Sequence, residues 1–154
     1  MSRIGKFAVN EKIVEVEYPD IEGFFIEVCY LSREELQKIR KKSSKVSWNK
    51  ITRQREEEVN DDLFLKHYAE KAVRGWRGLQ IKHLAEMLPV DLEGANLDED
   101  VPYTMDDALD LLRYSPDFDR FLGDVMNDLT IFAQEERESE EKNLKSTSNK
   151  PSVQ

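Results

Sequence analysis

Three side chains in this sequence are of the types that most often act in catalysis or bind metals: Cys29, His67 and His83. The two histidines are 16 residues apart, and no cysteine pair accompanies either of them at the short spacing typical of a zinc site. Cys29 falls in an expected strand without a basic neighbour, which favours a buried thiol over a nucleophile. We therefore expect no catalytic residues and no metal site.

An acidic segment around Asp91, Glu93 and Asp98 to Asp100 is the remaining candidate for ion binding. It lacks the alternating oxygen ligands and the central glycine of a calcium loop, so a solvated loop is the better interpretation. The sequence also lacks a phosphate-binding glycine loop and a serine in a nucleophile elbow. These absences predict a protein that is not an enzyme and that uses no cofactor.

Charge divides the chain into two unlike parts. The net charge is −9, but residues 1–53 hold 11 basic and 8 acidic side chains, which leaves 12 basic and 24 acidic ones for the rest. This acidic balance argues against nucleic acid as a partner, because phosphate backbones attract basic surfaces. A basic cluster in the first part, which includes Lys41, Lys42 and Lys45, is either a solvated surface or a docking site for an acidic segment of a partner or of this chain.

The environment of the protein is expected to be aqueous and reducing. One cysteine cannot form an internal disulfide, and the N-terminus does not have the pattern of a secretory signal. No apolar run approaches the roughly 20 residues that cross a bilayer. We expect a cytoplasmic protein that does not interact with membranes.

The first third of the chain has the pattern of antiparallel strands. Val14, Val16 and Tyr18 alternate with glutamates, residues 19–23 have turn chemistry, and Phe24 to Leu31 suits a returning strand. A further strand is expected around Lys6 to Val9. Together these patterns predict a hairpin or small antiparallel sheet within residues 6–31.

Helical periodicity and capping residues dominate the rest. Ser32, Asn60, Thr104 and Ser115 are suited to begin helices, and Pro116 suits a first helical position. Helices are predicted at about residues 33–42, 61–75, 80–88, 105–114 and 116–134, with residues 43–60 as a loop anchored by Trp48. The expected fold is a single α+β domain over residues 1–134, with the sheet packed on a mainly helical bundle.

The last predicted helix carries a continuous apolar stripe, which must be either buried or shared with a partner. Its best candidates for partner binding are Phe118, Phe121, Leu122, Val125 and Leu129. Packing within the domain is the alternative for the same stripe. The acidic and polar composition of residues 135–154 predicts a disordered tail.

Four segments, taken in order, resemble tail assembly chaperones of long-tailed, siphovirus-like bacteriophages or prophages. The resemblance covers about Phe24 to Phe132, and its most distinctive part is a glycine-tryptophan-x-glycine segment. The segments are Cys29-Tyr30-Leu31-Ser32-Arg33-Glu34-Glu35-Leu36, Val73-Arg74-Gly75-Trp76-Arg77-Gly78-Leu79, Asp100-Val101-Pro102-Tyr103-Thr104, and Ala108-Leu109-Asp110-Leu111-Leu112 followed by Ser115-Pro116-Asp117-Phe118.

The resemblance implies a non-catalytic assembly factor of the host cytoplasm. Such a chaperone binds the long, helical, apolar tape measure protein, keeps it soluble, helps to recruit tail tube protein around it, and leaves before the virion is complete. A second copy of the chain and a longer form made by ribosomal frameshifting are further expected partners. The alternative is a structural tail or connector component that is retained in the virion.

Overall fold

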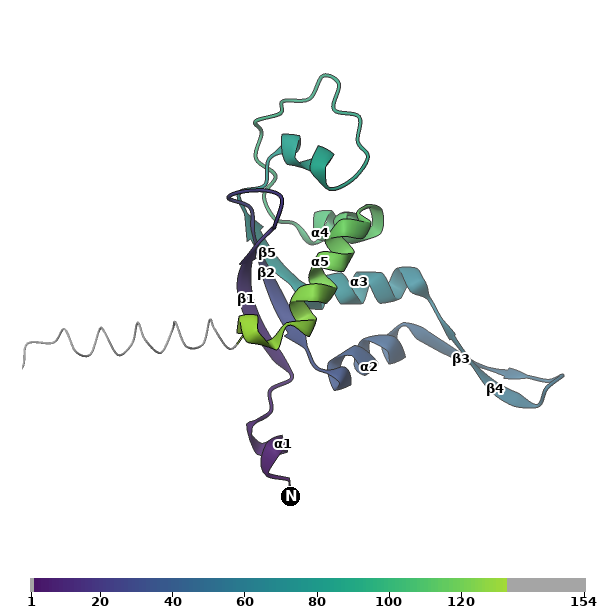
Figure 1. Ribbon diagram of the computed structural model, residues 1–154. Helices are drawn as coiled ribbons and strands as arrows, with labels where there is room; N and C mark the ends of the chain where they lie inside the picture. Colours follow the sequence, from purple (N-terminus) through teal and green to yellow (C-terminus); the bar gives the residue numbers. More distant parts are fainter. Residues whose placement is uncertain (1, 133–154) are drawn as a thin grey trace, which may run out of the picture.

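The computed structural model in Figure 1 describes residues 2–132. The tail predicted for residues 135–154 lies outside these residues, as do the last two positions of the helix predicted to end at residue 134. The described elements are α1 (Arg3–Phe7), β1 (Glu11–Glu17), β2 (Phe25–Leu31), α2 (Arg33–Lys42), β3 (Ser44–Asn49), β4 (Gln54–Val59), α3 (Asp61–Ala72), β5 (Val73–Arg77), the 3-10 helix η1 (Ile81–Glu86), α4 (Met105–Tyr114) and α5 (Pro116–Asn127).

The larger sheet has the strand order β1-β2-β5, with both pairs antiparallel. The hairpin of β1 and β2 is as predicted, with Val14 opposite Val28 and a turn closed by the Tyr18 N–H, which donates to the Phe24 carbonyl at 2.8 Å. Gly23 has a φ of +86° in this turn, which glycine adopts without steric cost. The alternation of apolar and polar residues in β1 therefore buries one face of the strand.

Side-chain caps begin the helices where the sequence predicts them. The hydroxyls of Ser32, Thr104 and Ser115 accept the backbone N–H groups three residues further on, at 3.1 to 3.2 Å, and the Asn60 side chain does the same for α3 at 3.1 Å. These bonds satisfy amides that have no partner within the helix. Helices α2 and α4 have the bounds expected from the sequence.

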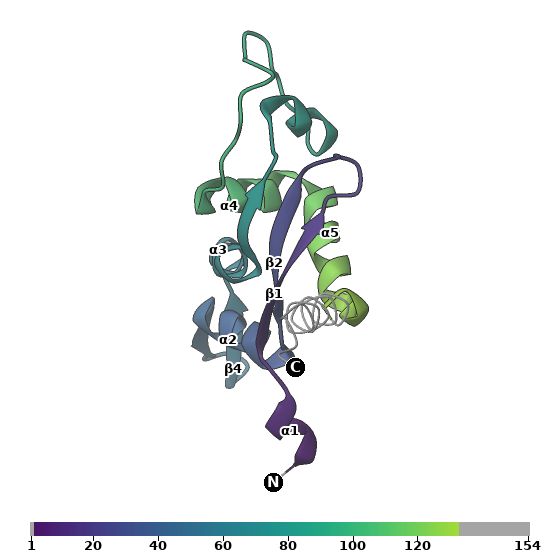
Figure 2. The same cartoon turned by 90° about the vertical axis from the view of Figure 1, so that its left-hand side faces the viewer.

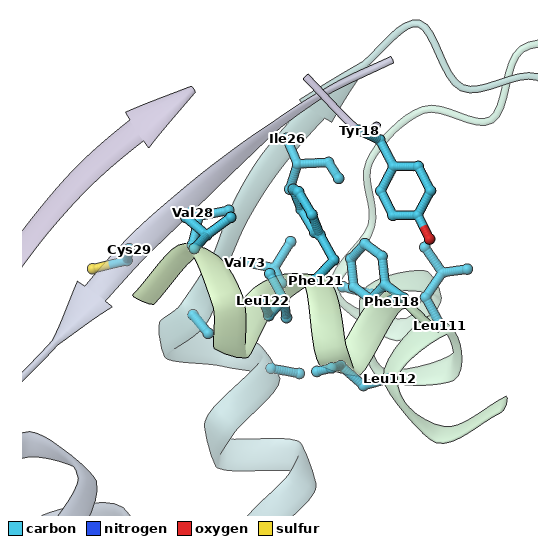
Figure 3. Packing of buried hydrophobic residues seen from close by; sticks show 14 of the residues in the cluster. Tyr18, Ile26, Val28, Cys29, Val73, Leu111, Leu112, Phe118, Phe121 and Leu122 are labelled. Atoms are coloured by element: carbon cyan, nitrogen blue, oxygen red, sulfur yellow. The ribbon is translucent and has the colours of Figure 1, made fainter. Parts of the chain in front are cut away.

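The helices α3, α4 and α5 gather on one side of the larger sheet (Figures 1 and 2). Ile26 and Val28 point from β2 toward Phe121 and Leu122 of α5 (Figure 3). All four side chains are buried, and they belong to one continuous cluster with residues of α3, α4 and β5. This arrangement of a small antiparallel sheet and packed helices confirms the α+β class.

Two expectations for the N-terminal half are wrong. The strand expected at Lys6 to Val9 is absent: Lys6 and Phe7 end the short helix α1, which Ser2 caps through its hydroxyl, and Ala8 and Val9 belong to no element. Residues 43–60 are not a loop, because β3 and β4 pair antiparallel over their whole length, with Ser44 opposite Val59 and Asn49 opposite Gln54. Polar and charged residues dominate these strands, so the alternation that would mark a half-buried strand is weak.

The helices predicted at residues 61–75, 80–88 and 116–134 have different limits. α3 ends at Ala72, and the chain continues directly into β5, whose pairing with β2 outweighs the helical pattern. The segment predicted as helix 80–88 forms η1 instead. α5 ends at Asn127 because Asp128 leaves the helical conformation, and helical residues resume at Leu129 to Phe132.

Besides α1, two segments extend from the body. Strands β3 and β4 project as an arm to the right beyond α2 and α3, and the chain between β5 and α4 forms an excursion at the top of the view (Figure 1). Backbone bonds tie the excursion together, including one from the Val101 N–H to the Leu79 carbonyl at 2.8 Å. Across the described residues, we find no helix with the length and apolar character needed to span a bilayer.

Candidate functional site

The apolar stripe of the last helix lies mostly in the core. Phe118 and Leu122 are fully buried, Val125 and Phe121 nearly so, and the Phe121 ring lies 5.0 Å from that of Tyr18. Packing within the domain, the alternative stated for this stripe, is therefore what the structure shows for these four residues. Of the five apolar side chains expected to meet a partner, Leu129 alone is on the surface, with 63% of its area exposed.

Leu129 borders a surface groove along α2. The groove consists of two adjoining hollows of about 440 Å³ and 550 Å³ that share Arg33 and Leu36, and we call it the α2 groove. Its apolar lining comes from β2, α2, β4, α3, α5 and the residues that follow α5. The apolar lining side chains are Tyr30, Leu31, Leu36, Val59, Phe64, Tyr68, Met126 and Leu129.

Aromatic packing fixes the floor of the α2 groove. The rings of Phe64 and Tyr68, one turn apart on α3, stack with their centroids 6.1 Å apart and their planes 11° from parallel. The Tyr68 hydroxyl lies 3.5 Å from the Met126 Sδ of α5. Burial and the nearby Asp119 raise the pKa of Tyr68 to about 12. The phenol is neutral at physiological pH, as a tyrosine of ordinary pKa is, and the half-buried rings of Phe64 and Tyr68 give the floor its apolar surface.

Charged side chains, two basic and one acidic, line the α2 groove. Arg33 borders both hollows, Arg40 and Asp61 border the larger one, and Arg40 Nε lies 3.7 Å from a carboxylate oxygen of Glu57 in β4. The cluster expected to dock an acidic segment continues beyond Arg40: Lys41 and Lys42 end α2, and Lys45 begins β3. These three lysines are exposed, and none forms an ion pair with another described residue.

The two histidines and the cysteine contact neighbouring groups of the domain. His83 Nδ1 accepts the Gln80 backbone N–H at 2.9 Å, and His67 lies 3.8 Å from Glu70 on the same helix. Burial raises the pKa of the Cys29 thiol, which lowers the fraction of reactive thiolate. Within residues 2–132 no group of three histidine, cysteine or acidic side chains is placed to hold a metal ion.

A separate hollow of about 380 Å³ lies between the excursion and α4. Its apolar lining includes Trp76, Leu84 and Leu88, and its acidic lining includes Asp100 and Asp107. The acidic segment of the sequence thus partly surrounds an apolar surface. The charged side chains that line this hollow are all acidic, whereas Arg33 and Arg40 line the α2 groove together with Asp61.

The α2 groove was not predictable from the sequence as a unit. Leu36, Phe64 and Tyr68 are recognisable as apolar positions of their helices, but the groove depends on how six segments meet. Nothing in local spacing indicates that Tyr30 of β2 lies near Leu129. The basic cluster, by contrast, is visible in the sequence because its members are close together along the chain.

Comparison with known proteins gives one family. The model of a family described as YdaY prophage protein matches residues 30–143, about three quarters of the chain. Neither a curated protein nor a solved structure matches the chain.

Proposed function

The chain belongs to the YdaY prophage protein family, and from this premise we propose that it is a non-catalytic tail assembly chaperone. In this proposal it binds the tape measure protein in the host cytoplasm, keeps it soluble, and helps to recruit tail tube protein. The prophage family supports a role in phage biology, and the order of sequence motifs supports tail assembly. A longer, frameshifted form that contacts the tube subunits is part of the same proposal.

The observation that carries the proposal is the α2 groove. It combines half-buried Leu36, Phe64 and Tyr68 with the exposed Leu129, so a partner can bury additional apolar area there without unfolding the domain. An amphipathic helix laid into an apolar groove is a common mode of peptide recognition. Because the flank at Lys41 and Lys42 is basic, the proposed occupant is a helix of the tape measure protein that carries acidic residues beside its apolar face.

The genes beside this one provide the first test. A tape measure gene immediately downstream and a tail tube gene upstream are the expected neighbours. Co-expression of that tape measure protein with this chain then tests binding directly, because a long apolar protein aggregates when expressed alone. We expect the tape measure protein to move from the pellet to the soluble fraction and to co-purify with the chain.

Two variants connect that result to the groove. Leu129→Asp places a charge at the groove without disturbing the core, so we expect the tape measure protein to remain insoluble. Leu97→Asp is the matched control, because Leu97 is 48% exposed but lies in the excursion at the other end of the molecule. It should solubilise the tape measure protein as well as the parent chain does.

Three outcomes would contradict the proposal. Continued aggregation of the tape measure protein beside the parent chain would remove the chaperone role. Equal solubilisation by Leu129→Asp and the parent would exclude the α2 groove as the binding site. Detection of the chain in purified particles at stoichiometric amounts would favour the alternative, a structural tail or connector component retained in the virion.

A further inference from the structure

The arm formed by β3 and β4 exposes large apolar side chains. Val46 and Trp48 of β3 are 58% and 61% exposed, and they lie on the same face of the hairpin because they are two residues apart. The arm projects away from the core (Figure 1). An isolated two-stranded hairpin is only marginally stable in water, so an arm with an exposed tryptophan gains stability from a partner.

The register of the arm shows which backbone groups face outward. The Asn60 N–H donates to the Ser43 carbonyl at 2.8 Å, and these residues continue the pairing in which Ser44 is opposite Val59. Hydrogen-bonded and non-bonded pairs alternate in an antiparallel ladder. Lys45, Ser47 and Asn49 therefore direct their backbone groups toward β4, whereas Val46 and Trp48 direct theirs toward the free edge of β3.

The two edges of the arm differ in charge. Strand β4 contains three consecutive glutamates, Glu56 to Glu58, so two β4 strands placed side by side would bring many carboxylates together. Strand β3 has no acidic residue, and its one basic residue, Lys45, lies near its beginning. The β4 edge is thus protected against strand addition, and the β3 edge is open to it.

We propose that β3 pairs antiparallel with β3 of a second copy of this chain, with Ser47 of each copy on the two-fold axis. In this register Val46 of one copy is opposite Trp48 of the other, and both exchange backbone hydrogen bonds. The proposal is independent of the proposed function, because it rests on the arm alone.

The register follows from the outward-facing residues. Antiparallel registers one step away make one apolar pair instead of two. Centring on Val46 pairs the two valines but places Trp48 opposite Ser44, and centring on Trp48 pairs the two tryptophans but places Val46 opposite Lys50. The register centred on Ser47 makes two pairs of an aromatic and a β-branched residue, a favourable combination across strands. It also places each Lys45 opposite Asn49, so that no like charges are paired. The product is a four-stranded sheet that gathers two valines and two tryptophans on one face.

Disulfide trapping tests this register. Residues at position 47 would form a non-bonded pair with Cα atoms about 4.5 Å apart, which suits a disulfide. We expect Ser47→Cys to give a covalent dimer under mild oxidation. Lys45→Cys is the matched control on the same strand and the same face: its two copies would be roughly 14 Å apart, too far for a disulfide. Cys29 is fully buried, so the parent chain should remain uncrosslinked.

Sedimentation velocity over a range of concentrations tests the interface without crosslinking. We expect the full chain to dimerise reversibly and Trp48→Thr to weaken the dimer by at least about ten-fold, because tryptophans commonly dominate interface energetics. Ile51→Ser is the control, since Ile51 is 94% exposed but lies in the turn of the arm. It should dimerise like the parent.

Several results would overturn the proposal. A chain that stays monomeric at every concentration would exclude the dimer. If Trp48→Thr dimerises as tightly as the parent, the proposed interface is excluded. Equal crosslinking of Ser47→Cys and Lys45→Cys would exclude the register. Burial of Trp48 only after addition of a tape measure segment, seen as a fluorescence shift in a Trp76→Phe background, would assign the arm to that partner instead.

Discussion

Replacing Gly78 by alanine tests the packing at the end of the glycine-tryptophan-x-glycine segment. Gly78 follows β5 and has a φ of +83°, a conformation that side chains other than that of glycine rarely adopt. A Cβ added there would lie 1.9 Å from the Gly23 carbonyl oxygen and 2.9 Å from its carbon. Both atoms belong to the backbone of the β1 to β2 turn, so no side-chain rotation can relieve the overlap.

The destabilisation expected for Gly78→Ala has a backbone part and a steric part, and the same substitution at another glycine isolates the first. The positive φ costs about 1 to 2 kcal/mol for alanine, and forcing an atom into packed surroundings costs about 1 to 3 kcal/mol more. Gly94 has a similar φ of +78° with no atom within 4 Å of the added Cβ, so Gly94→Ala should show the first part alone. We therefore expect Gly78→Ala to lower the free energy of unfolding by about 2 to 5 kcal/mol, and Gly94→Ala by about 1 to 2 kcal/mol.

Urea unfolding monitored by circular dichroism measures both effects. With an m-value of about 2 kcal/mol/M, a loss of 3 kcal/mol lowers the midpoint by about 1.5 M. Gly75→Ala provides a third comparison: its Cβ would meet the Glu27 carboxylate at 3.1 Å, and that flexible side chain can move away. If Gly78→Ala is no less stable than Gly94→Ala, the close approach of Gly78 to the β1 to β2 turn is refuted.

Three further predictions concern the core and its polar contacts. Trp76→Ala should lower the free energy of unfolding by about 3 to 5 kcal/mol, because it removes a packed ring and the hydrogen bond that the indole N–H donates to the Val101 carbonyl at 2.9 Å. Thermal melts measure this, and a mutant that melts like the parent would contradict it. Ser115→Ala should lower the free energy of unfolding in urea by about 1 to 3 kcal/mol, since the buried hydroxyl both caps α5 and donates to the Met87 carbonyl at 2.7 Å. An unchanged urea midpoint would show that neither hydrogen bond contributes to stability. The pKa of Tyr68 is raised from 10.0 to about 12, so the stabilisation from its neutral form is present below pH 10 and is lost as the pH rises through about 12. Burial also raises the pKa of Tyr18 and Tyr103, so several phenols should titrate late, and Tyr68→Phe should remove the last of them. An absorbance titration at alkaline pH that Tyr68→Phe leaves unchanged in its last step would place this ring in water.

Local features of the fold were predictable because local interactions produce them. The hairpin of β1 and β2 depends on alternation and on a turn, and the starts of α2, α4 and α5 depend on caps that lie beside the helix in sequence. The basic cluster at Lys41 and Lys42 is likewise a property of neighbouring residues. These features required no knowledge of the rest of the chain.

The candidate site was predictable only in fragments. The apolar stripe of α5 was recognised, but periodicity cannot tell whether a stripe faces its own sheet or a partner, and Phe118 and Leu122 face the sheet. After the helix break at Asp128, Leu129 is exposed and Phe132 is buried, a difference that the helical spacing did not indicate. The α2 groove exists because Tyr30, Leu36 and Tyr68 converge from separate elements.

The sequence by itself determined the α+β class, the caps and most helix positions, since each follows from residues within about one turn of one another. The tertiary structure decided the rest. Val73 to Arg77 continue a helical pattern but form β5, because pairing with β2, more than 40 residues earlier, satisfies their backbone groups in the sheet. Burial of the α5 stripe and exposure of the arm were decided in the same way, by contacts between segments far apart in the chain.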